Sequence, residues 1–199
     1  IFDSNAGWAK GSGQNSNLQS WMFKRHAGFD VVCFKGNGTA GHQISHSLSK
    51  TPEMIWIKNR DRSSDWRAGH KGQNGGTTPW NYQLVPSGND AESSYAGIFN
   101  NTAPTSSAFT VGADASVNQD GEAIIAMLFA SVDGISKCGF YDGSDSTITI
   151  TTGFAPRFVI IKVTNHSDSW IVLDTTRGWG SGNDQFLELN NNNAQAAAD

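Results

Sequence analysis

The sequence predicts an all-β protein built of tandem β-sandwich-like modules, of the jelly-roll or a related type. Its apolar residues come in short runs that are rich in β-branched and aromatic side chains, separated by Gly, Asn, Asp, Ser or Pro. This is the pattern of strands joined by turns. No segment keeps a helical period over three turns. The third observation is a duplication inside the chain, which predicts modules in tandem.

The expected strands are bounded by turn-forming residues. The run at 147–151 alternates Thr and Ile, as in a strand with one covered face, whereas 54–57 is apolar throughout, as in a strand covered on both faces. Only residues 193–198 have a helix-forming composition, and that stretch is short. The expected strands lie at 29–34, 54–57, 124–129, 147–151, 158–163 and 170–173.

The duplication aligns residues 51–58 with residues 155–162 at a constant offset of 104. Each copy places a Pro before the apolar run, a Lys at its end and a Trp further on. We interpret these recurring residues as structural, with Trp stacking on a sugar beside the Lys as the alternative. They are Pro52, Lys58 and Trp66 in the first copy and Pro156, Lys162 and Trp170 in the second.

A period near 105 residues suits tandem β domains, or one domain made of two related halves, and it divides the chain into three parts. Residues 1–20 are expected to be the tail of a preceding unit, 21–122 the first β unit, and 123–199 a second β unit truncated at its C-terminal end. The chain begins at Ile1 without a Met, so we expect a processed product or a fragment.

Composition excludes several classes of protein. Charged residues make up 16% of the chain, against about 25% in typical domains, and the seven Trp are the reverse of a disordered composition. The net charge is −4 with no basic block, which argues against a nucleic-acid partner. No apolar run approaches the roughly 18 residues of a membrane span, so no membrane insertion is expected.

Two motifs resemble cofactor or metal sites. Residues 36–41 fit the G-x-G-x-x-G pattern, but the residues after them alternate like a strand, so a hairpin turn is expected rather than a dinucleotide site. His42 and His46 would lie roughly 13 Å apart on a strand. No Cys or carboxylate nearby completes a ligand set, so neither a metal nor a cofactor is expected.

No catalytic residue is predicted, and we do not expect an enzyme. The chain has no G-x-S-x-G motif, and its carboxylates are too scattered to identify a glycosidase-like pair. Cys33 and Cys138 form either one bridge or two buried free thiols.

Two Trp residues are candidates for a contact surface. Trp8 and Trp179 lie in Gly-rich loops, where little chain is available to bury a large aromatic side chain, and Arg177 stands beside the second. A neighbouring subunit or a ligand is the expected partner of these residues.

Several strings taken together resemble a known family. They are Trp-Met-Phe-Lys-Arg at 21–25 leading to 28–32, the Gly-rich turn at 36–39 leading to 51–60, and the segments 103–112, 128–137, 153–162 and 170–178. As a set they are similar to the repeat region of large virion proteins of marine phages, especially tailed cyanophages, described as tail-fibre or uncharacterised structural proteins. The resemblance covers nearly the whole chain, implies a β-rich appendage module on the virion exterior, and carries over no catalytic residue.

We therefore expect a bacteriophage virion structural protein, a tail-fibre or appendage module that acts in assembly and host-surface contact. Its expected partners are other virion proteins, further copies of itself and a host surface glycan, with a trimer expected by analogy with fibres. The alternative is a lectin-like carbohydrate-binding module that recognises host glycan through its loop Trp residues.

Overall fold

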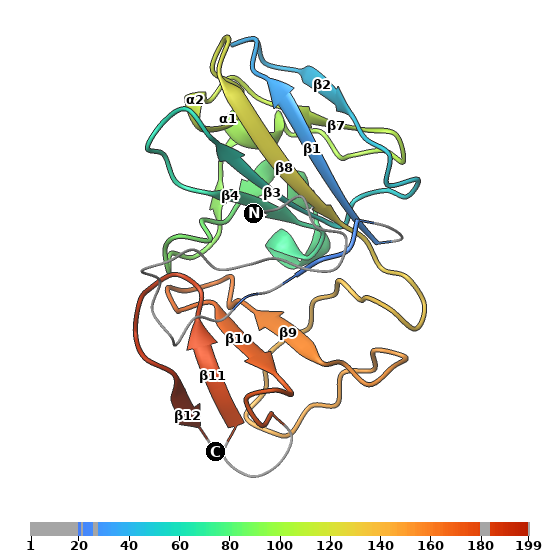
Figure 1. Cartoon of the computed structure of the whole chain (residues 1–199), viewed down its shortest axis with the longest axis vertical. Coiled ribbons are helices and arrows are strands. Elements are labelled where there is room, and N and C mark those ends of the chain that lie inside the picture. Colours follow the sequence, from blue (N-terminus) through green and yellow to red (C-terminus); the bar gives the residue numbers. More distant parts are fainter. Residues whose placement is uncertain (1–19, 21, 26–27, 180–183, 199) are drawn as a thin grey trace, which may run out of the picture.

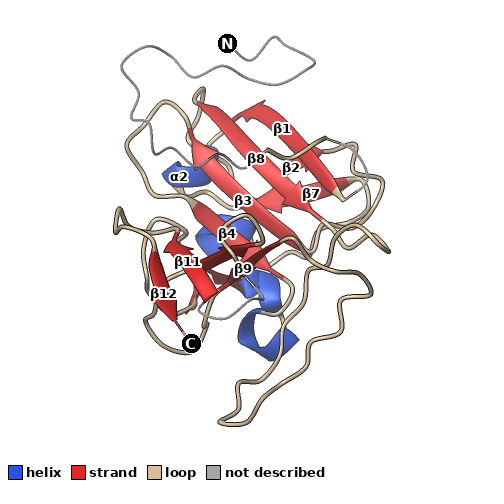
Figure 2. Ribbon diagram, turned by 60° about the horizontal axis from the view of Figure 1, so that its bottom comes forward, coloured by secondary structure: helices blue, strands red, loops and turns tan. Residues whose placement is uncertain are grey.

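The computed structural model describes residues 20, 22–25, 28–179 and 184–198. Within these residues the prediction of an all-β protein is confirmed, because the chain forms antiparallel sheets and its helices are single turns of three or four residues (Figures 1 and 2). The helices are η1 (Gln73–Gly76), η2 (Pro79–Asn81), α1 (Ala96–Phe99) and α2 (Ala115–Asn118).

The first half of the chain is organised around a four-stranded sheet in the order β1-β8-β3-β4. A two-stranded sheet, β2–β7, and the short helices lie on one side of it (Figure 1). A further pair, β5–β6, follows at the edge of β4 that faces away from β3, where Ala68 and Leu84 form an isolated bridge. The strands are β1 (Phe29–Lys35), β2 (His42–Ser45), β3 (Met54–Asn59), β4 (Arg67–His70), β5 (Tyr82–Gln83), β6 (Ser93–Ser94), β7 (Ala108–Val111) and β8 (Ala123–Phe129).

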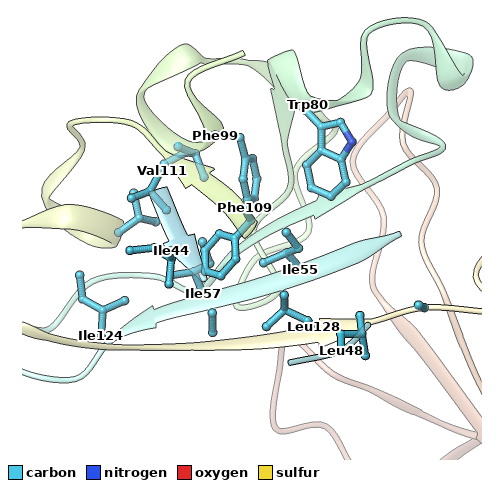
Figure 3. Close-up of a cluster of buried hydrophobic side chains, with 14 residues drawn as sticks. Ile44, Leu48, Ile55, Ile57, Trp80, Phe99, Phe109, Val111, Ile124 and Leu128 are labelled. Carbon is cyan, nitrogen blue, oxygen red and sulfur yellow. The ribbon is translucent and has the colours of Figure 1, made fainter. Parts of the chain in front are cut away.

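The inner face of this sheet carries the main hydrophobic core. Alternate residues of β3 and β8 are fully buried, because successive side chains of a strand point to opposite faces. They pack against side chains from β2, β7, α1 and η2 (Figure 3). The core side chains are Ile55, Ile57, Ile124, Ala126 and Leu128 from the sheet, and Ile44, Phe99, Phe109, Val111 and Trp80 from the covering layer.

The outer face of the same sheet carries aromatic residues that contact the second half of the chain. Trp56 meets Trp170 edge to face, with ring centroids 6.1 Å apart. The ring of Phe23 lies between Phe129, at 5.8 Å, and Phe158, at 6.0 Å. Strand β3 is therefore covered on both faces, as the unbroken apolar run at 54–57 predicted.

The second half of the chain forms one four-stranded antiparallel sheet in the order β12-β11-β10-β9. Each strand pairs with the next one along the chain, so the sheet is a meander. Its last strand lies within the stretch of helix-forming composition at 193–198, because so short a stretch cannot nucleate a helix and instead pairs with β11. The strands are β9 (Phe158–Ile161), β10 (Ile171–Asp174), β11 (Asp184–Glu188) and β12 (Ala196–Ala198).

Two sequence-based expectations about local structure were wrong. The turn at 36–41 does not close a hairpin, because β1 pairs with β8 and β2 pairs with β7, so the loop crosses from one sheet to another. No strand forms at 147–151, where Ile148 and Ile150 are 40% and 49% exposed and no strand of the described chain pairs with them.

Strand pairs in the two halves share their registers. Met54 opposes His70 in β3–β4, and Phe158 opposes Asp174 in β9–β10, so both members are shifted by 104 residues. Tyr82 opposes Ser94 in β5–β6, and Gln185 opposes Ala197 in β11–β12, a shift of 103 for both. The bridge between Ala68 and Leu84 has its counterpart in Val172 and Leu187.

Gly69 lets two aromatic rings approach the backbone of β4. A Cβ atom at this position would lie 2.6 Å from Cε2 of Phe99 and 2.7 Å from Cζ3 of Trp80. Both rings are buried in the main core, so neither can move aside without disturbing its neighbours.

We predict that Gly69→Ala lowers the free energy of unfolding by about 1–3 kcal/mol, the usual cost of overpacking a core. Urea denaturation followed by Trp fluorescence measures the change. Gly139→Ala is the matched control, because a Cβ atom there has no neighbour within 4 Å and the change should be within about 0.5 kcal/mol. Equal stability of both variants would contradict the close packing at Gly69.

Candidate functional surfaces

The predicted contact residues fall in two different settings. Trp8 lies outside the described residues. Arg177 and Trp179 lie in the turn after β10, and Asp174 organises this turn by accepting the backbone N–H of Arg177 at 3.0 Å and pairing with its guanidinium. The Arg177 side chain is only 7% exposed, so its charge is committed to Asp174, whereas Trp179 is half-buried.

The recurring residues make mostly internal contacts. Lys58 donates its ammonium to the carbonyl of Asn59 and, at 3.0 Å, to that of Arg62, while Lys162 donates to the carbonyl of Val163 at 2.5 Å. Each Lys therefore caps the end of its own strand in the same way.

The recurring Trp is more buried in the second copy, and the recurring Pro is more buried in the first. Trp170 is 4% exposed and donates its indole N–H to the carbonyl of Val85 at 3.2 Å, while Trp66 is half-buried. Pro52 is buried and Pro156 half-buried. Trp170 and both Lys residues thus bond to backbone carbonyls of the chain itself. Their structural role stays a prediction, with Trp stacking on a sugar as its alternative.

A shallow hollow of about 350 Å³ lies along β1 and beside the loop at 45–47. Its floor is the carboxylate of Asp30, which is 2% exposed and accepts hydrogen bonds from the Ser47 N–H at 2.8 Å and the Ser47 hydroxyl at 2.9 Å, as well as from Arg25. Burial would raise the pKa of Asp30, but these hydrogen bonds hold it below its ordinary value. The Asp30 carboxylate in this hollow is thus already hydrogen-bonded within the protein.

Asp30 was missed from the sequence, although a signal was present. It is the single charged residue within the apolar run at 29–34, and it occupies an inward position of β1 beside Val31 and Phe29, which face the other way. A carboxylate at such a position must find hydrogen bonds inside the protein.

A second group of polar residues missed from the sequence fixes the loop at 36–41. Asn118 is fully buried, and its amide donates to the carbonyls of Thr39 at 2.9 Å and Gly112 at 2.8 Å. Its oxygen accepts the N–H of Asn37 at 3.0 Å and lies 3.0 Å from Nδ1 of His42. Asn118, in the Asx-rich stretch at 116–121, is therefore the residue whose hydrogen bonds hold this loop in place.

A partly buried cluster brings together Glu53, Lys71 and Cys138, whose side chains are of types that can act in catalysis. Glu53 accepts the Ser131 N–H at 2.6 Å and pairs with Lys71, and these bonds outweigh burial and lower its pKa. Burial, reinforced by the charge of Glu53, raises the pKa of the Cys138 thiol to about 12. A thiol with this pKa is protonated at neutral pH and is a poor nucleophile.

His70 stands next to this cluster. Burial, together with the charge of Lys71, lowers its pKa to about 4. Its Nδ1 accepts the Gly72 N–H at 3.0 Å, which requires the unprotonated nitrogen. The imidazole is thus neutral and holds the turn after β4.

The cysteines and the remaining histidines are spread over the chain. Cys33 and Cys138 are both free, and Cys33 is exposed rather than buried. Nε2 of His46 lies 3.2 Å from the carbonyl of Thr105. Within residues 22–25, 28–179 and 184–198, no three His, Cys, Asp or Glu side chains gather as a metal site would require.

These features define an all-β protein whose buried polar groups bond mainly to its own backbone. The chain belongs to the family described as "Domain of unknown function (DUF7483)", whose model matches residues 3–199 and so spans both sheets. Neither a curated protein nor a solved structure matches it. None of the described helices has the length and apolar character needed to cross a bilayer.

We predict that acidification destabilises the fold through His70. In the unfolded state a His titrates near 6.5. Between pH 6.5 and about 4 the unfolded chain therefore binds more protons than the folded one, and the free energy of unfolding decreases as the pH is lowered. Over the whole window the loss amounts to about 3 kcal/mol. His70→Asn keeps an acceptor for the Gly72 N–H and should flatten the dependence between pH 6.5 and 5.

Urea denaturation at a series of pH values measures this slope. A slope that survives His70→Asn would show that another group causes it.

Proposed function

We propose that the protein is a structural module of a bacteriophage tail fibre or similar virion appendage, made of tandem β units that act in assembly and host-surface contact. The observation that carries the proposal is the repeated register of β3–β4 and β9–β10, continued in β5–β6 and β11–β12. Shared register over four strands is hard to obtain without a common origin, since a slip of one residue reverses the faces of a strand. Proteins built from repeated units commonly serve as extended scaffolds.

Paired residues with different chemistry support the duplication. His70 and Asp174 occupy equivalent positions and both accept a backbone N–H of the following turn, from Gly72 and from Arg177 respectively. The Lys71 N–H bonds to the carbonyl of Glu53, and the equivalent Thr175 N–H bonds to that of Arg157. Equivalent positions in the two halves therefore make equivalent hydrogen bonds with different side chains.

The use of the polar groups also favours a structural role. Asp30, Asn118 and Asp174 all hold loops or turns in place. The low content of charged residues leaves Asn, Ser, Thr and Gly to form the surface, and a surface of this kind depends little on charge attractions that salt would screen. The jelly-roll topology, the trimer and the virion location are parts of the same proposal.

The proposal is tested on virions of a phage that encodes this chain. Peptides of the protein should appear in the mass spectrum of purified particles, and gold-labelled antibody against it should decorate an external appendage. The isolated chain, of 21.3 kDa, should elute in light scattering as a trimer. Absence from washed particles would overturn the proposal, whereas a monomer in solution would overturn only the trimer.

A lectin-like carbohydrate-binding module is the second candidate, favoured by the half-buried indole of Trp179 in the turn after β10. Trp179→Ala should then weaken binding to a host glycan at least tenfold on a glycan array while leaving the melting temperature unchanged. Tyr95→Ala, which removes an exposed aromatic side chain from the first half of the chain, is the control and should bind as the unmodified protein does. Failure to bind any host glycan would overturn the lectin proposal and leave the structural role as the one proposed function.

A further inference from the structure

Strand β1 forms one edge of the first sheet within the described part of the chain, where it pairs with β8 alone (Figure 1). The C=O of Gly28 accepts the Ala130 N–H at 2.9 Å, and the Gly36 N–H donates to the C=O of Glu122 at 3.0 Å. Both pairs continue the register of β1–β8. The even-numbered residues of β1 therefore direct their backbone groups to β8, and the odd-numbered residues direct theirs away from it.

Three outward backbone groups of β1 have no hydrogen-bond partner among the described residues. They are the C=O of Val31 and the N–H and C=O of Cys33. The Val31 N–H also points outward, but it donates to Oδ1 of Asp30 at 2.9 Å. The Cys33 side chain is exposed, so this part of the edge is accessible. A polypeptide strand beside β1 would supply partners for all three groups.

A groove runs beside this edge. The hollow of about 350 Å³ along β1 is continued by a second one of about 500 Å³. Both are lined by Arg25, Asp30 and Ser47, so they form one continuous groove between β1 and the loop at 45–50, the β1 groove. A strand added to β1 would direct every second side chain to the face of the sheet on which Asp30 and Ser47 lie.

The β1 groove has an excess of positive charge. The Arg25 side chain is 63% exposed, and its guanidinium pairs with Asp30 and donates to the Ser47 hydroxyl at 2.8 Å, which leaves further N–H groups open. Lys50 lines the groove and Lys35 ends β1, and each is exposed and donates to one backbone carbonyl. Asp30, already hydrogen-bonded, is the single carboxylate among the described residues that line the groove.

We propose that the β1 edge and the β1 groove bind an extended segment of another protein that is apolar at alternate positions and carries a carboxylate. The segment adds to β1 as a further strand, with main-chain hydrogen bonds to Val31 and Cys33, and its Asp or Glu side chain pairs with the guanidinium of Arg25. Strand addition of this kind takes affinity from the main chain and specificity from the side chains beside the edge. The inference does not depend on the proposed function.

The charge and the lining of the groove select this occupant over a second copy of the chain. A second copy paired through β1 would bring its own Arg25 and Lys35 to an edge that already carries both, and like charges disfavour strand pairing. Phe29, Val32 and Leu48 line the groove beside the charged residues. Apolar side chains on both sides of the carboxylate therefore complement it.

The test selects a display library of random short peptides on the 199-residue chain. Enriched peptides should share an Asp or Glu with apolar or β-branched residues at alternate positions, and each should bind saturably at one site per chain. Hydrogen exchange should slow at 29–35 when a synthetic copy of an enriched peptide is bound. Replacing its acidic residue by the corresponding amide should weaken binding at least tenfold.

Variants of the chain locate the site. Cys33→Pro removes one outward N–H and no bond of the β1–β8 ladder, a position where an edge strand tolerates Pro, and the peptide should bind it at least tenfold more weakly. Cys33→Ser is the matched control, because it keeps the N–H and should bind as the unmodified chain does. Methylating the backbone nitrogens of the peptide tests the same bonds if Cys33→Pro does not fold.

A second pair of variants tests the charge. Arg25→Gln should weaken binding of the acidic peptide at least tenfold and leave binding of its amide counterpart unchanged. Arg60→Gln is the matched control, since Arg60 is exposed and does not line the groove, and it should bind both peptides as the unmodified chain does.

Four outcomes would overturn the inference: no enriched peptide, enriched peptides without a carboxylate, undiminished binding by Cys33→Pro or by the methylated peptide, or exchange protection outside β1 alone. A dimer of the chain that Cys33→Pro abolishes would identify a second copy as the occupant and overturn it as well. The test involves neither virions nor glycans, so its failure leaves the proposed appendage role standing, and absence of the protein from virions leaves this binding result standing.

Discussion

The central strands β3 and β8 of the sheet β1-β8-β3-β4 carry apolar side chains on both faces, and much of the structure follows from the need to cover both. Ile55 and Leu128 on the inner face require the β2–β7 pair and the helices, while Trp56 and Phe129 on the outer face require contact with the second sheet. Burial of this apolar area is the main favourable term of the fold. The two halves of the chain are thus parts of one packing problem, which agrees with a family match that spans both.

Covering a sheet with loops and single-turn helices exposes many backbone groups that have no regular partner, and buried amides and carboxylates supply the missing bonds. Asn118 serves the loop at 36–41, Asp30 serves the loop at 45–47, and Asn59 donates to the carbonyl of Ala115 at 2.9 Å. Each is costly to bury alone and favourable once bonded. These are the buried polar residues in which a functional site would be sought, and in the structure their hydrogen bonds go to the chain itself.

Strand positions could be predicted from the sequence because alternation and turn residues are local signals, as at β3 and β8. The offset of 104 likewise identified the register that β9–β10 shares with β3–β4. Pairing between distant strands could not be predicted, so the turn at 36–41 was assigned to a hairpin. The strand expected at 147–151 failed for a related reason: its alternation is right, but alternation produces a strand only where a partner lies alongside. Asp30 and Asn118 were missed because their importance comes from burial, which depends on those same distant contacts.

The distance along the chain between paired strands has a consequence for how the protein reaches its native state. Phe29 pairs with Phe129 and His42 with Val111, so the first sheet closes loops of many tens of residues before its contacts repay the lost chain entropy. The β9–β12 meander closes only short loops. During synthesis β1 has to wait for β8 to emerge from the ribosome, which leaves its edge and Cys33 open to other chains for longer than any part of the meander.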